Sequence, residues 1–115
     1  MSTAVDICPH VAYSLHMPEI RQTEQFEKWY LGLKDKKAQA KIAQRLVRIQ
    51  SGNMGDVKFF GSIGEVRIHH GPGYRLYFVK QGEFIILLLC GGDKGSQNRD
   101  IEKASKLATE ARDDT

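Results

Sequence analysis

The chain has 115 residues, of which 41% are hydrophobic and 27% charged, and its formal net charge at pH 7 is +3. This composition is typical of a globular domain with one modest core, and it indicates a chain that is neither intrinsically disordered nor embedded in a membrane. The longest apolar run, Phe84 to Cys90, has seven residues. A membrane-spanning helix needs about 20, so no such helix is predicted.

Positive charge is concentrated in the middle of the sequence. Residues 34–80 contain ten Lys and Arg residues against three Asp and Glu residues, whereas both flanking segments carry a small acidic excess. A basic segment in a nearly neutral chain indicates either a surface that contacts phosphate groups or an ordinary solvated helix face. Charge alone leaves both interpretations open.

The N-terminal segment lacks the basic start and the long apolar run of a signal peptide. Met17, just before the first patterned segment, is a candidate alternative start. We therefore expect residues 1–16 to be a poorly ordered extension and residues 17–115 to form a single domain. The two cysteines, Cys8 and Cys90, predict no disulfide framework, and Cys90 is expected to be a small buried side chain. These features predict a cytoplasmic protein.

The first half of the domain is predicted to contain a short strand and two helices. Residues 19–23 have the pattern of an edge strand. A short helix follows, with an apolar face formed by Phe26, Trp29, Tyr30 and Leu33. Asp35 can cap a second helix whose apolar stripe consists of Ala38, Ile42, Leu46 and Ile49. The adjoining stripe of Lys37, Lys41, Arg45 and Arg48 is interpreted as a solvated face, and the short link predicts a helical hairpin.

The second half changes to a period of two, which predicts strands at 57–60, 65–70, 74–79 and 84–90. The last of these does not alternate, so both of its faces should be covered, as in a central strand. A weakly amphipathic C-terminal helix is predicted from Ile101, Ala104, Leu107, Ala108 and Ala111. The predicted fold is an α+β domain in which an N-terminal helical hairpin packs on a small antiparallel sheet, with a C-terminal helix.

The stretch VRIHHGPGYRLYFVK predicts a hairpin with one basic face. If His70 pairs with Tyr74, the alternation of side chains directs Val66, Ile68, Leu76 and Phe78 toward the helices. The opposite face then carries Arg67, His69, Arg75 and Tyr77, with Glu65 as the one acidic residue nearby.

This basic cluster suits cleavage of an RNA backbone. Arginine binds phosphate through paired hydrogen bonds, and histidine can accept or donate the proton. Lys94, in the segment GGDKGSQNR, could complete the catalytic set of Arg67, His69 and Arg75. Tyr77, which could stack on a base, is predicted to bind RNA together with Lys58 and Arg99. The alternative is that the basic face is solvated surface.

Other kinds of site find little support in the sequence. His69 and His70 point opposite ways on a strand, and no third ligand has a suitable spacing, so we expect no metal. The glycines of GPG and GGDKG match no phosphate-loop or dinucleotide fingerprint, and no cofactor is expected.

The segments VKFFGSIGEVRIHHGPGYRLYF and IILLLCGGDKGSQNRDIEKA resemble the RelE/ParE superfamily of toxins from type II toxin–antitoxin modules. The similarity, which extends from Pro18 to Ala111, is to the HigB-like branch of addiction module killer proteins. It implies a helical hairpin on a curved antiparallel sheet and metal-independent cleavage of mRNA in the ribosomal A site. It also implies that Arg75 is a catalytic phosphate-binding residue, with Arg67 and Lys94 in supporting basic positions.

One departure from the family pattern concerns the general base. RelE-type toxins often carry a C-terminal tyrosine, but this chain has no tyrosine after Tyr77, and Asn98 or Asp100 lies in that region. His69 is then a candidate proton acceptor, and the choice of base stays open. The resemblance leaves two alternatives to a nuclease: a ParE-like inhibitor of DNA gyrase, and an inactive remnant that binds its antitoxin.

The expected partners are mRNA in the ribosomal A site and a cognate antitoxin, a small helix-turn-helix protein, in a toxin–antitoxin hetero-oligomer. If Phe78 pairs with Ile85, an apolar surface of Ile86, Leu88 and Cys90 adjoins the basic cluster. An acidic amphipathic segment could dock there, unless the C-terminal helix covers this surface instead.

Overall fold

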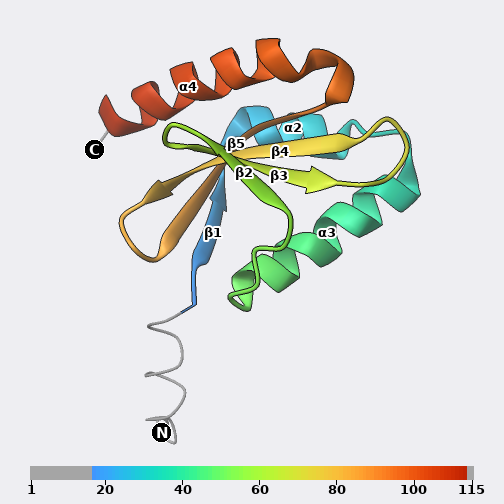
Figure 1. The fold of residues 1–115 in the computed structure, drawn as a ribbon, viewed down its shortest axis with the longest axis horizontal. Helices are drawn as coiled ribbons and strands as arrows, with labels where there is room; N and C mark the ends of the chain where they lie inside the picture. The colour runs from blue at the N-terminus through green and yellow to red at the C-terminus, as the bar shows by residue number, and fades with distance from the viewer. Residues whose placement is uncertain (1–16, 114–115) are drawn as a thin grey trace, which may run out of the picture.

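The computed structural model describes residues 17–113, so the expectation that residues 1–16 are a poorly ordered extension lies outside the described residues. Figure 1 shows the arrangement of the elements. In chain order they are β1 (Glu19–Gln22), α2 (Glu24–Leu31), α3 (Lys36–Gln50), β2 (Val57–Phe60), β3 (Ile63–Ile68), β4 (Tyr74–Gln81), β5 (Ile85–Asp93), the 3-10 turn η1 (Lys94–Ser96) and α4 (Gln97–Asp113). Among these residues no helix is long and apolar enough to cross a membrane.

The five strands form one mixed sheet in the order β1-β5-β4-β3-β2. β1 runs parallel to β5, whereas the other neighbouring strands are antiparallel. The chain therefore enters the fold as a strand, and the Thr23 amide donates to the Leu88 carbonyl at 3.0 Å before the first helix begins. The predicted fold, an N-terminal helical hairpin packed on an antiparallel sheet, is wrong. The sheet is mixed, because β1 precedes the helices in the chain and pairs parallel with β5.

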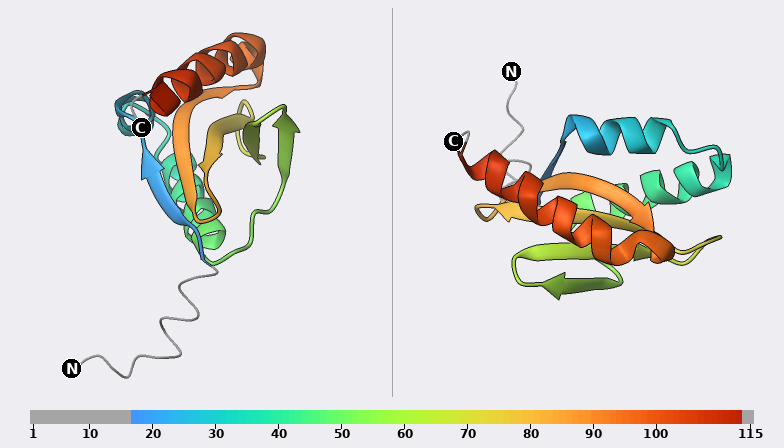
Figure 2. Two further views of the ribbon diagram at one scale, coloured as in Figure 1. Left: turned by 90° about the vertical axis from the view of Figure 1, so that its left-hand side faces the viewer. Right: turned by 90° about the horizontal axis from the view of Figure 1, so that it is seen from above.

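The helices cover both faces of the sheet (Figures 1 and 2). α2 and α3 lie over one face, in a core formed by Phe26, Ile42, Ile49, Val66, Ile68, Leu76, Phe78, Ile86 and Leu88. α4 lies over the other face, in a core formed by Ile63, Tyr77, Leu87, Leu89, Cys90 and Ala104. The apolar faces predicted for the three helices all point into these cores. Thr23 caps α2, and Asp35 caps α3 as predicted.

The β3–β4 pairing is shifted by two residues from the predicted register. Ile68 lies opposite Tyr74 and Arg67 opposite Arg75, so His69 belongs to the connecting loop and not to a strand. A shift of two leaves each side chain on its predicted face, because alternation along a strand has a period of two. Arg67 and Arg75 therefore share a face of the sheet, as predicted.

β5 lies inside the sheet with both faces covered, as predicted, but its pairing with β4 differs. Phe78 pairs with Leu88, and Ile86 and Leu88 pack against α2 and α3. Cys90 packs under α4. The apolar surface predicted for an antitoxin is thus divided between two cores, and the part beside Tyr77 is covered by the C-terminal helix.

Two adjacent glycines of β5 let both helical layers approach the sheet. A Cβ atom on Gly91 would overlap the ring of Trp29 from α2, and one on Gly92 would overlap the carboxylate of Asp100 from α4. Both positions therefore require glycine for packing.

Candidate phosphate-binding site

A pocket of about 420 Å³, here called the phosphate pocket, opens where β3 ends and β4 begins. Its lining consists of Arg67, His69, His70, Gly71, Pro72, Gly73, Arg75 and Lys94. In Figure 1 the β3–β4 loop that frames it lies beside the start of α3. The structure brings together all four residues predicted to be catalytic, because the loop, the two strand ends and η1 meet at this end of the sheet.

Arg75 is the most unusual cation of the phosphate pocket. Its side chain is only 8% exposed, and its Nε atom is buried without a hydrogen-bond partner among the described residues. It also lies directly opposite Arg67 on the neighbouring strand, where like charges repel. A buried N–H donor without an acceptor is costly, and an anion bound beside Arg75 would complete its hydrogen bonds. The site is thus suited to binding an anion.

Asp56 holds two residues of the pocket. Its Oδ1 atom accepts from Nη2 of Arg67 at 3.1 Å, and its Oδ2 atom lies 2.6 Å from Nε2 of His69. The hydrogen bond to His69, followed by that to Arg67, lowers the pKa of the Asp56 carboxyl below its usual value. The prediction that Glu65 is the one acidic residue near the cluster is therefore wrong.

His70 is held by a second carboxylate. Its Nε2 atom lies 3.0 Å from Oδ2 of Asp35, and its ring stacks on Tyr74 with centroids 6.5 Å apart. Asp35 also caps α3, and the Ala38 amide, followed by His70, lowers the pKa of its carboxyl. This pairing fixes the β3–β4 loop to the start of α3. Two imidazoles, each bound to a carboxylate through Nε2, thus line one pocket.

Arg45 fixes the segment that carries Asp56. Its guanidinium group donates to the backbone carbonyls of Met54, Asp56 and Arg67, at 2.9 to 3.0 Å. Because all three contacts are to backbone oxygens, Arg45 joins α3 to the start of β2 and the end of β3. The backbone of Asp56 is therefore held in place by these hydrogen bonds from Arg45.

Tyr77 does not face solvent and cannot stack on a nucleotide base, so its predicted RNA-binding role is wrong. It is fully buried under α4, and its hydroxyl donates to Oε2 of Glu65 at 3.0 Å. Gln97 donates to the same oxygen at 2.8 Å, and Glu65 is itself fully buried. Burial, followed by the hydrogen bond to Glu65, raises the pKa of Tyr77, so the phenol remains protonated. This contact joins the sheet to the first turn of α4.

The region expected to replace the missing tyrosine is also structural. Asp100 is buried over Gly92 and accepts a hydrogen bond from Ser96. Cys90, below it, is buried as predicted, and burial raises the pKa of its thiol to about 12, which makes it a poor nucleophile. Asp100 and Asn98 do not line the phosphate pocket.

The remaining predicted RNA-binding cations lie apart from the pocket. Arg99 is exposed in an adjoining groove of about 280 Å³ that also includes Lys94. Lys58 is exposed on β2, with Nζ 5.1 Å from the centre of the Phe60 ring, and does not line the phosphate pocket. Among residues 17–113 no group of three or more His, Cys, Asp and Glu side chains could hold a metal ion.

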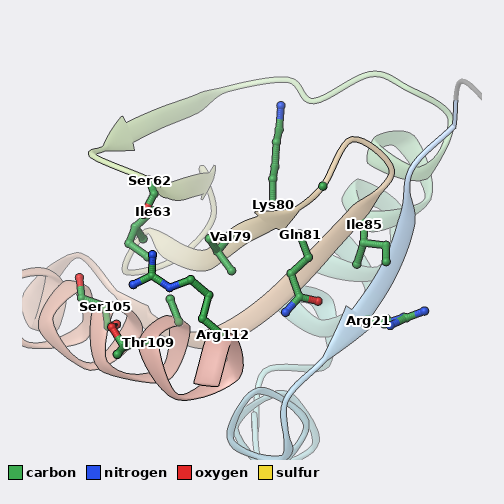
Figure 3. A pocket seen from close by; sticks show the side chains of 12 residues that line it. Arg21, Ser62, Ile63, Val79, Lys80, Gln81, Ile85, Ser105, Thr109 and Arg112 are labelled. Atoms are coloured by element: carbon green, nitrogen blue, oxygen red, sulfur yellow. The ribbon is translucent and has the colours of Figure 1, made fainter. Parts of the chain in front are cut away.

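A larger cavity of about 670 Å³, the distal pocket, lies between α4 and the opposite ends of β3, β4 and β5. Figure 3 shows Arg112 extending from α4 toward Ser62 and Ile63, whereas Lys80 and Arg21 point away. Arg21 pairs with Glu19 at 2.7 Å. None of the residues predicted to be functional lines this cavity.

Comparison with known proteins identifies one family. No protein-family model matches the chain. Over 93 residues it is 45% identical to an uncharacterized protein of Haemophilus influenzae, and the match covers 80% of this chain and 94% of that protein. The chain therefore belongs to the same family as the Haemophilus influenzae protein. The description of that relative assigns no activity to the family.

Proposed function

We propose that this family member is an endoribonuclease of the toxin–antitoxin type, which cleaves mRNA by side-chain acid–base chemistry and so inhibits translation. The observation that carries the proposal is the buried side chain of Arg75, whose Nε donor has no acceptor among the described residues, in a pocket lined by further cations. The resemblance to RelE/ParE toxins of the HigB-like branch points in the same direction. An mRNA substrate would place the action in the cytoplasm.

The first step is the binding of the scissile phosphate. Arg75 and Lys94 make no hydrogen bond or ion pair with the other described residues, so their donors can bind the two non-bridging oxygens. Arg67, oriented by Asp56, adds a third positive charge. The same donors bind more strongly as negative charge builds on these oxygens in the transition state.

The second step is proton transfer by the two histidines. With Nε2 of His69 directed at Asp56, Nδ1 is the atom that accepts the proton of the 2′-hydroxyl. The 2′-oxygen bonds to phosphorus as the bond to the 5′-oxygen breaks, and protonated His70 supplies the leaving oxygen with a proton. The products are a 2′,3′-cyclic phosphate and a 5′-hydroxyl.

The carboxylate-bound histidines favour the nuclease over the alternatives. A ParE-like gyrase inhibitor acts by binding and does not require two oriented imidazoles beside an anion site. An inactive remnant would have no reason to keep Arg75 buried without a partner, which lowers stability. The proposal includes a cognate antitoxin, a small helix-turn-helix protein, whose acidic groups would bind the phosphate pocket in a hetero-oligomer.

The test is induction of the wild type, Arg75→Gln and the control Arg21→Gln in a translating extract, followed by primer extension on mRNA. We expect cuts from the wild type and the control, and a loss of about a hundredfold or more for Arg75→Gln. A parallel gyrase supercoiling assay separates the alternatives. Intact mRNA with blocked supercoiling would reject the nuclease in favour of gyrase inhibition, and no effect in either assay would indicate the inactive remnant.

A further inference from the structure

The phosphate pocket continues into a second basic groove along α3. This α3 groove, of about 210 Å³, shares Arg67 and His69 with the phosphate pocket. The rest of its polar lining comes from one face of the helix, namely Lys41, Gln44, Arg45 and Arg48. No carboxylate lines either cavity. The helix stripe interpreted from sequence as a solvated face therefore adjoins the site directly.

The α3 cations divide into two groups with different tasks. Arg45 is committed to three backbone carbonyls and cannot bind a ligand without releasing them. Lys41 and Arg48 are exposed, and their side chains make no hydrogen bond or ion pair with the described residues. Burial, followed by the charge of nearby Arg48, lowers the pKa of Arg45, and the charge of Asp56 opposes this shift. The groove thus offers two available cations, Lys41 and Arg48, beside the cations Arg45 and Arg67.

We infer that the α3 groove binds the phosphates of nucleotides that flank the scissile bond, through Lys41 and Arg48. The inference rests on the proposed function and specifies its substrate, a single strand of RNA several nucleotides long. A mononucleotide or dinucleotide could fill the phosphate pocket but could not extend along α3. A single strand is required because the 2′-oxygen must align opposite the leaving oxygen, and a stacked duplex does not reach this alignment.

The test measures binding of uncleavable 2′-O-methyl RNA by fluorescence anisotropy at several salt concentrations. The ligands are a dinucleotide and a strand of about ten nucleotides, within the range of lengths bound by single-strand-binding sites. The variant Lys41→Gln/Arg48→Gln is compared with Lys28→Gln/Lys106→Gln. The control removes the same two positive charges from exposed positions on α2 and α4 that lie outside both cavities. A difference between the two variants therefore reports position and not net charge.

We expect the α3 variant to bind the longer strand about tenfold more weakly and to reduce the salt dependence, the slope of log K against log salt, by about 1.4. Its affinity for the dinucleotide should equal that of the wild type, because the phosphate pocket is unchanged. Equal slopes for the α3 variant and the control, or an equal loss for both ligands, would overturn the inference.

Arg75→Gln distinguishes failure of the inference from failure of the proposed function. We expect this variant to lose affinity for both ligands, since every bound strand places a phosphate beside Arg75. If Arg75→Gln weakens binding but the α3 variant matches the control, the inference fails and the proposed site stands. If the wild type binds neither ligand, the proposed function fails and the inference fails with it.

Discussion

The phosphate pocket and the distal pocket lie at opposite ends of β3, β4 and β5, and they differ in what their cations contact. In the phosphate pocket Arg75 is buried and unpaired, and two histidines are oriented by carboxylates. In the distal pocket Arg112 extends from α4 toward Ser62 and Ile63, whereas the side chains of Arg21 and Lys80 point away, and the floor is mainly apolar. The distal pocket is the larger of the two.

Under the proposed function, the reaction takes place at the smaller pocket, so size would be a poor guide to the reactive end of the sheet. A pocket with an apolar floor can arise where small side chains of a helix leave the space above a sheet unfilled. The second half of α4 has such side chains in Ala108 and Ala111. A buried donor without an acceptor, such as Arg75 Nε, has a cost in free energy, which makes this end of the sheet the stronger candidate for a ligand site. The following predictions test whether chemistry is confined to the phosphate pocket.

Arg75→Gln should have the largest effect on activity. We expect RNA cleavage to fall by about a hundred- to a thousandfold, because the main donor to the phosphate is lost. The melting temperature should not fall and should rise slightly, since Arg75 Nε has no partner to lose and the cost of burying the cation is removed. Cleavage rates and thermal unfolding check both parts, with Arg21→Gln in the distal pocket as the control. Equal activity in the two variants would remove the contrast between the pockets.

Glu65→Leu should have the largest effect on stability. The variant leaves the buried Tyr77 hydroxyl and the Gln97 amide without their acceptor, which should cost about 2 kcal/mol of unfolding free energy. Urea unfolding measures this loss. Glu65→Gln, which keeps an acceptor oxygen, should lose less and should cleave RNA at nearly the wild-type rate. Loss of cleavage in a stable Glu65→Gln protein would show that the buried cluster takes part in the chemistry.

Asp56→Asn should have an intermediate effect, because in the proposed reaction Asp56 acts only through His69 and Arg67, which it orients. We expect the cleavage rate to fall by about tenfold, with a shifted pH–rate profile. The lowered pKa of Asp56 also adds folding stability that is complete above the usual carboxyl value of 3.8 and is lost as the pH falls below it.

Urea unfolding over a range of pH tests this second part. The wild type should be more stable than Asp56→Asn at neutral pH, and the difference should shrink as the pH falls below 3.8. A constant difference at all pH values, or a pH–rate profile identical to that of the wild type, would show that Asp56 does not act through its charge.

Ala108→Leu should have the smallest effect. The added side chain fills part of the distal pocket, so cleavage should stay within about twofold of the wild type and stability should change by less than about 1 kcal/mol. Cleavage rates and thermal unfolding provide the measurement. A large loss of cleavage in a well-folded variant would assign the distal pocket a part in the reaction.

Much of the core could be predicted from periodicity, because burial repeats with the geometry of each element. The helix faces of Phe26, Ile42 and Ala104 all pack as predicted. Arg67 and Arg75 were predicted on one face because alternation survives a register error of two residues. The mixed sheet could not be predicted in the same way, since the pairing of β1 with β5 joins segments far apart in the sequence.

The acidic half of the site could not be predicted for the same reason. Asp35, Asp56 and Glu65 are the three carboxylates in the basic segment, and they contact His70, the Arg67–His69 pair and Tyr77, respectively. Each contact spans 11 or more residues, so no local pattern predicts it. The scarcity of carboxylates among so many cations was the available signal. Tyr77 was misassigned because strand alternation cannot show that α4 covers its face.

The glycine pair at the end of β5 bears on mutational tolerance. Gly91 and Gly92 have no side chains, so Trp29 and Asp100 pack directly against the backbone of β5 from opposite faces of the sheet. In a saturation library these two codons should accept almost no substitution, even though neither residue lines the phosphate pocket or the distal pocket. Engineered variants that alter the β3–β4 loop should therefore leave this dipeptide intact, because it sets the spacing between the two helical layers.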